Sequence, residues 1–302
     1  MPFRTTPIQF AVLAMLLASA LIAVTTLIAK LLGQPLAGAP ALHPFVVSAG
    51  RFVFALSALL AVLSLRPRLR VTLSGARFDH HLARALCGWL GVTALFAASA
   101  QMPLAEATAI SFLSPLVTMA LALLFLGEGA TRRKLVAAAL AVFGALTLLQ
   151  PGTDAFQPAA FLALAAAALL GVEAIFIKLL SDREPPMRIL VINNVIGAAF
   201  SLTAAAFVWS WPTLPQWVLL VAIGVVMVAG QAYFIQAMKG AAASTVIPVF
   251  YSTLAFAAFY DFVLFGVRPT GDALFGCALI ALGAWALSTA PKAHAEAASG
   301  QN

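Results

Sequence analysis

Apolar runs of about 20 residues recur along the whole chain and constrain its fold more than any motif does. A run of this length crosses a bilayer as an α-helix, because a helix satisfies its backbone hydrogen bonds within one segment. The runs do not alternate apolar and polar residues as the strands of a membrane barrel do. The sequence therefore predicts an all-α integral membrane protein. The ten expected spans are Phe10–Leu32, Phe45–Leu65, Leu82–Ala100, Leu104–Leu126, Leu135–Leu149, Pro158–Leu180, Arg188–Trp209, Trp217–Met238, Ala242–Leu264 and Ala273–Thr289.

Composition excludes a soluble domain. Hydrophobic residues make up 63% of the sequence and charged residues 9%, whereas soluble domains average about 45–50% apolar residues. The first apolar run is longer than the roughly 7–15 residues of a signal-peptide core, so we expect an uncleaved first span. Cys87 and Cys277 stand alone in apolar runs, which favours small buried side chains over a metal site.

The distribution of positive charge predicts the orientation. If the N-terminus is cytoplasmic, the cytoplasmic side holds all of the 17 Lys and Arg residues except Lys30, Arg51 and Arg268. The positive-inside rule then places both termini in the cytoplasm. Contact with anionic lipid headgroups accounts for the net charge of +7, so nucleic-acid binding gains no support. An Ala-rich composition with more Arg than Lys favours a bacterial inner membrane.

The chain contains an internal duplication. The stretch Leu95–Glu128 has a weaker counterpart at Tyr233–Gly266, and a shift of 137 positions places Ala100 on Ala237. Each copy holds five spans, an odd number, so the second copy must cross the membrane in the opposite sense. Inverted repeats are common in carriers, whose halves rock around a site near the middle of the bilayer. The expected division is residues 1–150, residues 151–290 and a disordered cytoplasmic tail at residues 291–302.

The most specific pattern begins at Ala100. It reads AQMPLAEATA, continues through Ser114-Pro115 to Leu126-Gly127-Glu128, and is followed by Gly144 and Gln150-Pro151-Gly152. In these motifs the chain resembles the ten-helix members of the drug/metabolite transporter superfamily, which have two EamA-type repeats. The second copy departs from the pattern, because Ser252 and Phe265 stand where the first copy has Pro115 and Glu128.

The resemblance implies a secondary transporter that works by alternating access. It also implies a substrate cavity lined by spans one, three, four, six, eight and nine. Members of the superfamily move amino acids, nucleotide-linked metabolites, vitamins or drugs. We expect an amino-acid exporter, and the alternative is a carrier or importer of another metabolite, such as a vitamin, a nucleoside-type compound or a drug-like compound.

Charged side chains within predicted spans are candidates for function, because a charge at the bilayer centre costs about 2.5–3.5 kcal/mol on insertion scales. Arg51 could bind a carboxylate bidentately, or it could snorkel to the surface or bond a neighbouring carbonyl. Glu173 is a candidate for proton coupling or amine binding, with a structural ion pair as the alternative. Glu106 is a second coupling candidate, although a carboxylate in a first helical turn also suits the positive helix end.

Uncharged polar and aromatic side chains in the spans are the main candidates for solute binding. Pro115 and Pro248 each remove a backbone donor and free a carbonyl group, so nearby hydroxyls could complete a polar pocket. The alternative roles are hydrogen bonding between helices for the serines and ordinary packing for the aromatic residues. The expected solute-binding residues are Gln231, Tyr251, Ser244, Ser252, Ser111, Ser114, Trp89, Phe176 and Arg51.

Other classes of protein have weaker support. A membrane enzyme would need a paired acid and base or a metal cluster, but the four histidines fall at span ends or in the tail. A channel would show a continuous polar stripe. Small residues in the predicted spans Leu135–Leu149 and Ala273–Thr289 allow close packing within a monomer or a weak homodimer. The expected partners are a small organic solute and the bilayer, with no cofactor and no metal.

Overall fold

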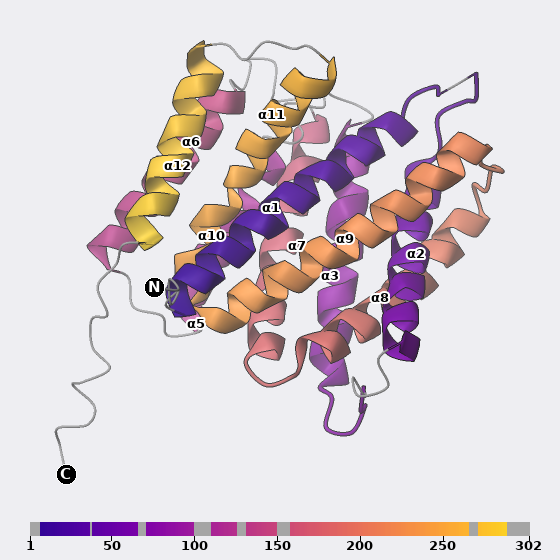
Figure 1. Ribbon diagram of the computed structural model, residues 1–302, viewed down its shortest axis with the longest axis horizontal. Coiled ribbons are helices and arrows are strands. Elements are labelled where there is room, and N and C mark those ends of the chain that lie inside the picture. The colour runs from indigo at the N-terminus through magenta and orange to yellow at the C-terminus, as the bar shows by residue number, and fades with distance from the viewer. Residues whose placement is uncertain are drawn as a thin grey trace.

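The chain folds as a bundle of α-helices (Figure 1). The computed structural model describes residues 7–36, 38–65, 71–99, 110–125, 131–149, 158–265 and 271–288. Its helices are α1 (Pro7–Leu32), α2 (Pro44–Leu65), α3 (Phe78–Ser99), α5 (Ser114–Phe125), α6 (Arg132–Leu149), α7 (Pro158–Ser181), α8 (Pro186–Ala206), α9 (Leu214–Gly240), α10 (Ala243–Phe250), α11 (Ser252–Phe265) and α12 (Gly271–Ser288). Five of them, α1, α2, α7, α8 and α9, are each long and apolar enough to cross a membrane. Together with the shorter apolar helices they confirm the predicted all-α membrane fold of ten spans.

Two predicted spans are broken near a proline. Helices α10 and α11 together correspond to one span, and the break follows Pro248, which cannot donate a backbone hydrogen bond. The Tyr251 N–H donates to the Pro248 carbonyl over 3.3 Å before the chain continues as α11. In the first copy, a turn in which the Leu113 N–H donates to the Ile110 carbonyl over 3.0 Å leads into α5. Both breaks lie beside the central cavity.

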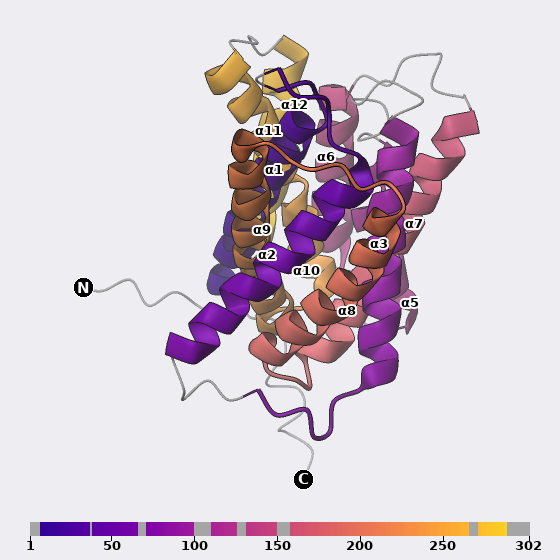
Figure 2. The same ribbon diagram turned by 90° about the vertical axis from the view of Figure 1, so that its right-hand side faces the viewer.

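The helix contacts repeat when the two copies are exchanged. Helices α1, α2, α3 and α6 of the first copy correspond to α7, α8, α9 and α12 of the second. Helix α1 packs along α9, and the exchanged pair, α7 and α3, packs in the same way. Helix α2 packs against its own counterpart α8, and α6 packs against α12 (Figure 2). This pattern is the one expected for two inverted five-helix repeats.

Small residues bring the last helices of the two copies close together. A Cβ atom built at Gly283 of α12 would lie 2.9 Å from the Ala137 carbonyl oxygen of α6. The absence of a side chain at Gly283 therefore permits direct contact between the two helix backbones. This contact places the small-residue faces noted in the sequence within one chain.

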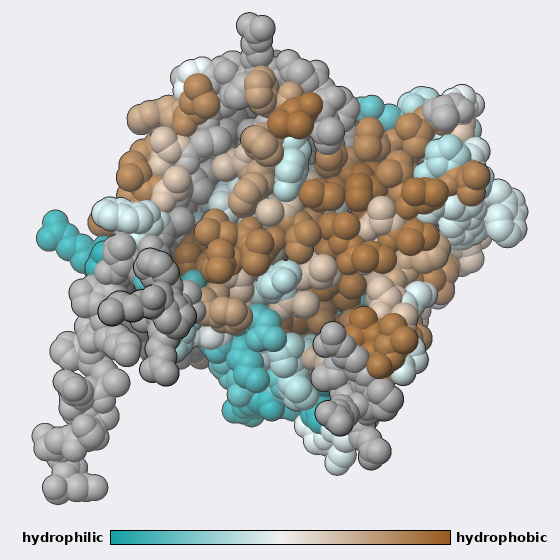
Figure 3. All heavy atoms as spheres, in the orientation of Figure 1, coloured by the Kyte–Doolittle hydropathy of each residue, from teal (hydrophilic) through white to brown (hydrophobic). Residues whose placement is uncertain are grey.

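The outer surface is apolar over the bundle and polar at one end. Figure 3 shows hydrophobic side chains spread over the face made by α1 and α9. Hydrophilic side chains gather below, around the turn between α7 and α8, where Asp182 and Arg183 are exposed. We call this end the terminal face; it holds the first turns of α1, α3 and α8 and the last turns of α7 and α9. The opposite end is the far face.

Candidate functional site

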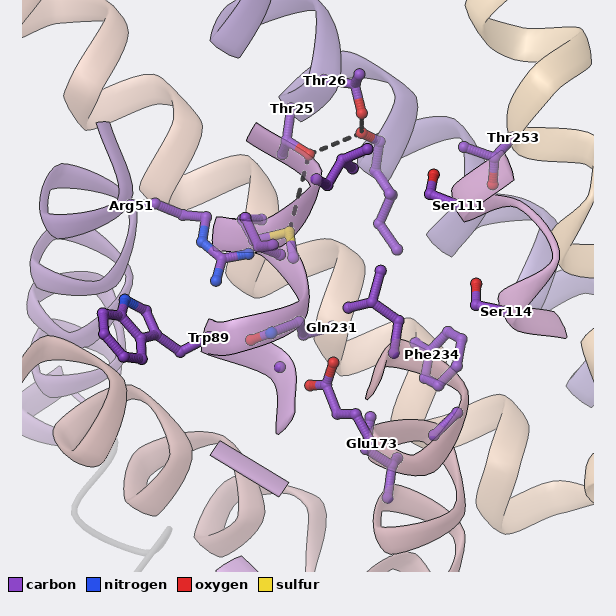
Figure 4. A pocket seen from close by; sticks show the side chains of 18 of the residues that line it. Thr25, Thr26, Arg51, Trp89, Ser111, Ser114, Glu173, Gln231, Phe234 and Thr253 are labelled. Carbon is purple, nitrogen blue, oxygen red and sulfur yellow. Dashed lines mark hydrogen bonds between the residues drawn. The ribbon is translucent and has the colours of Figure 1, made fainter. Parts of the chain in front are cut away.

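A cavity of about 260 Å³ lies inside the bundle (Figure 4). Residues of α1, α3, α5, α7, α9, α10 and α11 line it, as the family resemblance implies for the corresponding spans. Helices α2 and α8 also contribute to its wall. On α1 and α2 the lining residues belong to the turns nearer the far face. The cavity is therefore reached by helices of both repeats.

Six of the predicted site residues line this one cavity. Arg51 comes from α2, Trp89 from α3 and Gln231 from α9. Ser111 and Ser114 come from the turn before α5 and from its first residue, because the chain is broken there. The candidate coupling residue Glu173 comes from α7. Residues far apart in the sequence are thus brought together around one cavity by helices of both repeats.

The other predicted site residues are not part of this lining. They are Tyr251, Ser244, Ser252 and Phe176, while Glu106 falls outside the described residues. Tyr251 is buried at the break between α10 and α11, with its ring 6.4 Å from that of Phe112. Phe176 lies nearer the terminal face, edge-on to His80 at 5.6 Å. These side chains belong to the walls between helices rather than to the cavity surface.

Opposite charges face each other across the cavity. Figure 4 shows the Arg51 guanidinium and the Glu173 carboxylate pointing into the space, with Gln231 between them. Arg84 lies behind Glu173, fully buried, with its Nε 3.9 Å from Glu173 Oε1. Arg84 is held there because its Nη1 donates to the Ile189 carbonyl over 3.2 Å. Among the described residues that line the cavity, Arg51 is the one cation and Glu173 the one carboxylate, and Arg84 adds a second positive charge behind Glu173.

Gly88 allows Glu173 to lie directly against α3. A Cβ atom built at Gly88 would be 2.7 Å from the Glu173 Oε1 and 2.8 Å from its Oε2. Any side chain at this position would therefore displace the carboxylate. Gly88 follows Arg84 by one helical turn, so the two residues together form the seat of Glu173 on α3.

Aromatic rings form an apolar wall. The rings of Phe112 and Phe250 are stacked at 6.2 Å, and Phe234 meets Phe250 edge-on at 5.5 Å. All three line the cavity, as do Phe52 and Trp89. Such a wall favours the apolar part of an organic solute, while the charged groups fix its polar part.

Arg84 and Asn193 are not among the residues that the sequence predicts for the site. The charge distribution places Arg84 on the cytoplasmic side, although it falls inside the predicted span Leu82–Ala100. The rule that singled out Arg51 would have found it as well. Asn193 is 2% exposed and lines the cavity from α8, but its spacing gave no indication of the direction in which it points.

The bundle is closed between the cavity and the terminal face. Buried side chains from both copies pack there, including Met15, Leu180, Ile189, Ile235 and Met238. Lys178 adds a polar tie, because its Nζ donates to the carbonyls of Met238 and Ala241 over 2.8 and 3.1 Å. No group of three or more His, Cys, Asp or Glu residues that could hold a metal occurs in the part of the chain that the structure describes.

Known proteins with similar sequences are membrane transporters. The model of the EamA-like transporter family matches residues 9–150 and 157–289. A pseudopaline exporter of Pseudomonas aeruginosa is 29% identical, over 80% of this chain and 85% of its own length. An S-adenosylmethionine uptake transporter of Rickettsia bellii is 28% identical, over 79% and 81% of the two chains. A riboflavin transporter of Rhizobium johnstonii is 31% identical, over 66% and 67%.

A protein of known crystal structure shares the fold. Its chain superposes with a TM-score of 0.77 at 23% sequence identity, covering 92% of this chain and 96% of its own.

The names of the sequence relatives indicate transport rather than enzymatic activity. They name three different solutes, and both export and uptake, so the choice of solute must be argued from the cavity.

Proposed function

Because the chain belongs to the EamA-like transporter family of small-molecule carriers, we propose that its solute is a small zwitterion, in the simplest case an amino acid, and that it works as an exporter. The observation that carries this proposal is that Arg51 and Glu173 face one cavity from different helices. An arginine fork suits a carboxylate, and a carboxylate suits an ammonium group. A single small solute could satisfy both.

The size of the cavity supports a small solute. Ligand pockets commonly enclose roughly 300–1,000 Å³, and this cavity of about 260 Å³ falls just below that range. Its aromatic wall leaves room for an apolar side chain beside the charged groups. An amino acid with an apolar or aromatic side chain combines these properties.

The proposed mechanism is alternating access between two inverted repeats. In the described conformation, packed side chains and the Lys178 tie close the bundle toward the terminal face. The positive-inside rule predicts that the terminal face and both chain ends lie on the cytoplasmic side of a bacterial inner membrane, so for export this face would open to load the solute. An impermeant thiol reagent tests the orientation: in intact cells it should label a Trp211→Cys variant and spare an Arg183→Cys variant.

Counterflow in liposomes tests the transport proposal. Purified protein loaded internally with an unlabelled amino acid should take up the same labelled amino acid with saturation, and faster than empty vesicles do. Arg51→Gln should weaken the apparent affinity by roughly tenfold or more, because hydrogen bonds to charged groups contribute about 1.5–3 kcal/mol. Arg183→Gln is the control, since Arg183 is exposed in the α7–α8 turn. A conducted current without acceleration by internal solute would instead indicate a channel.

Glu173 is the residue we propose for coupling to protons. A proton gradient imposed on the liposomes should change the rate of the wild-type carrier, and Glu173→Gln should abolish that response. Uptake that ignores the gradient in both proteins rejects coupling and leaves facilitated exchange. The proposal of a zwitterionic solute does not depend on this result.

A second candidate is a carrier for a planar metabolite, such as a vitamin or a nucleoside-type compound. The stacked rings of Phe112 and Phe250 favour it, since flat rings stack on aromatic side chains. The relatives named as riboflavin transporters agree with this alternative. Competition distinguishes the two: inhibition of amino-acid counterflow by amino acids alone supports the zwitterion, and inhibition by riboflavin or nucleosides alone supports the planar metabolite.

A further inference from the structure

Four buried hydrogen-bond donors at the cavity have no acceptor among the described residues; one is the Ser48 hydroxyl, which can also accept. The other three are N–H groups that can only donate, namely Arg51 Nε, Trp89 Nε1 and Asn193 Nδ2. All three residues line the cavity. A buried donor without an acceptor is unfavourable, and such groups in a folded protein call for an explanation. A solute that accepts hydrogen bonds would supply one.

Helix α8 holds these three donors on the same wall. Asn193, Gly197 and Phe200 follow one another at helical spacing and share one side of α8. The ring of Phe52 rests on Gly197, where an added Cβ would lie 2.3 Å from its Cε1. The Arg51 guanidinium in turn lies 4.2 Å from the centre of the Phe52 ring.

Trp89 reaches the same side of α8 from α3. Its ring stacks on Phe200 with the centroids 5.8 Å apart and an interplanar angle of 24°. Figure 4 shows the Trp89 ring on the same side of the cavity as Arg51. The donors thus come from α2, α3 and α8. Trp89 is held against α8 by stacking on Phe200, and Arg51 is held there through the Phe52 ring that packs on Gly197.

The other wall of the cavity carries acceptors. Gln231 Oε1 is buried on α9 without a donor among the described residues, and the Glu173 carboxylate lies on α7. The cavity therefore has a donor wall of α2, α3 and α8, and an acceptor wall of α7 and α9. A solute bound between them would have a defined orientation, with its anionic end toward α8.

We propose that Arg51, Trp89 and Asn193 form a carboxylate subsite that fixes this orientation and selects for solutes with a planar anionic group. The proposal deepens and rests on the proposed function, because it places the acidic end of the same solute. Two carboxylate oxygens offer enough lone pairs for three donors. Arg51 is the one cation among the described residues that line the cavity, which matches a carboxylate better than a doubly charged phosphate. Trp89 and Asn193 are then specificity-determining residues that contact the solute.

Binding of three related probes tests the subsite. Phenylalanine carries a carboxylate and an amine, 3-phenylpropionate lacks the amine, and phenethylamine lacks the carboxylate. Thermal-shift titration of the purified full-length protein should show binding of the first two, with phenethylamine at least tenfold weaker. Trp89→Phe keeps the stacked ring and removes the N–H, and Asn193→Leu keeps most of the volume. Each should weaken both carboxylate probes by roughly threefold to tenfold.

Asn194→Leu is the matched control. Asn194 is the adjacent buried asparagine, but its Nδ2 donates to the Leu190 carbonyl of its own helix over 2.8 Å. It should leave the affinity for both carboxylate probes unchanged, and all three variants should elute as the wild type does in gel filtration. Equal binding of phenethylamine and 3-phenylpropionate overturns the proposal, as does unchanged carboxylate binding in the Trp89 and Asn193 variants. Tight binding of 3-phenylpropionate without any amino-acid counterflow upholds the subsite and rejects the zwitterion carrier.

Discussion

At the scale of single residues, Gly88 controls where Glu173 lies. Gly88→Ala would place a methyl group 2.7 Å from the Glu173 Oε1, so the carboxylate must leave its seat beside Arg84. The carboxylate is the far end of a flexible side chain and can move aside, so the cost falls at the lower end of the roughly 1–3 kcal/mol that overpacking causes. We expect a lower melting temperature in detergent and an at least fivefold loss of transport. Gly271→Ala is the control, because no atom of the described residues lies within 4 Å of a Cβ built there.

A second substitution tests whether the effect of Gly88→Ala arises from steric overlap between the new methyl group and the Glu173 side chain. In Gly88→Ala/Glu173→Ala the carboxylate that collides with the new methyl group is absent. The double variant should melt above Gly88→Ala/Glu173→Gln, which keeps the longer side chain, while transport stays low in both. Equal melting temperatures for these two double variants would show that the effect of Gly88→Ala does not arise from contact with Glu173.

The sequence predicted the residue types of the cavity better than their orientation. Arg51 and Glu173 are predicted because a charge inside a span is costly and is usually kept for a function. The same rule applies to Arg84, but Arg84 lies close to the end of its span and can also be read as a charge at the membrane surface. Serines could not be sorted in this way. Ser114 lines the cavity and Ser252 does not, although the duplication places them only one position apart, because one residue along a helix turns the side chain by about 100°.

At the scale of elements, Glu184 joins the start of α3 to the turn between α7 and α8. Its Oε1 accepts the Arg77 backbone N–H over 2.9 Å, and its Oε2 lies 3.0 Å from His81 Nε2. Burial favours the protonated form of Glu184, but the hydrogen bonds from Arg77 and His81 and the charge of Arg188 outweigh it. The pKa of Glu184 therefore falls below its ordinary value of 4.5.

This shift predicts how stability depends on pH. The folded protein binds a proton at Glu184 less tightly than the unfolded chain does. The contacts of ionised Glu184 with Arg77 and His81 therefore stabilise the fold fully above about pH 4.5. That contribution is lost as the pH falls through the folded value. Glu184→Gln should melt lower than wild type at pH 7, and the difference should shrink toward pH 3. Arg183→Gln, an exposed change in the same turn, should leave the melting temperature unaltered at both pH values. If Glu184→Gln lowers the melting temperature by the same amount at every pH, ionised Glu184 is not the source of the effect.

Lys178 links α7 to the end of α9. Its Nζ donates to two carbonyls at that end, where the helix dipole is negative. Lys178→Met should lower the free energy of unfolding by about 1–2 kcal/mol, since a partly buried cation at a helix C-terminus contributes up to that amount. Denaturant titration can compare it with Lys239→Met, whose cation is exposed at the same helix end. Equal losses in the two variants would exclude a specific role for the tie.

At the scale of the whole molecule, length and periodicity predicted the fold, and the duplication predicted its symmetry. Each span is read from local sequence, so ten helices and their order follow without tertiary information. The pairing of α1 with α9 and of α3 with α7 does not follow from the local sequence. It depends on which side of each helix carries small residues, and these helices are apolar on every side, because both lipid and protein neighbours are apolar.

Alternating access makes a prediction for the complete carrier. A short reversible thiol cross-linker between His81→Cys and Glu184→Cys, in a background with Cys87→Ala and Cys277→Ala, should hold the terminal face closed. These two side chains are 3.0 Å apart in the described conformation, and one belongs to each repeat. The cross-link should reduce counterflow by at least tenfold, reduction should restore it, and each single-cysteine variant should be insensitive to the reagent. Full counterflow in the cross-linked protein would mean that the solute does not leave through an opening between α3 and α7.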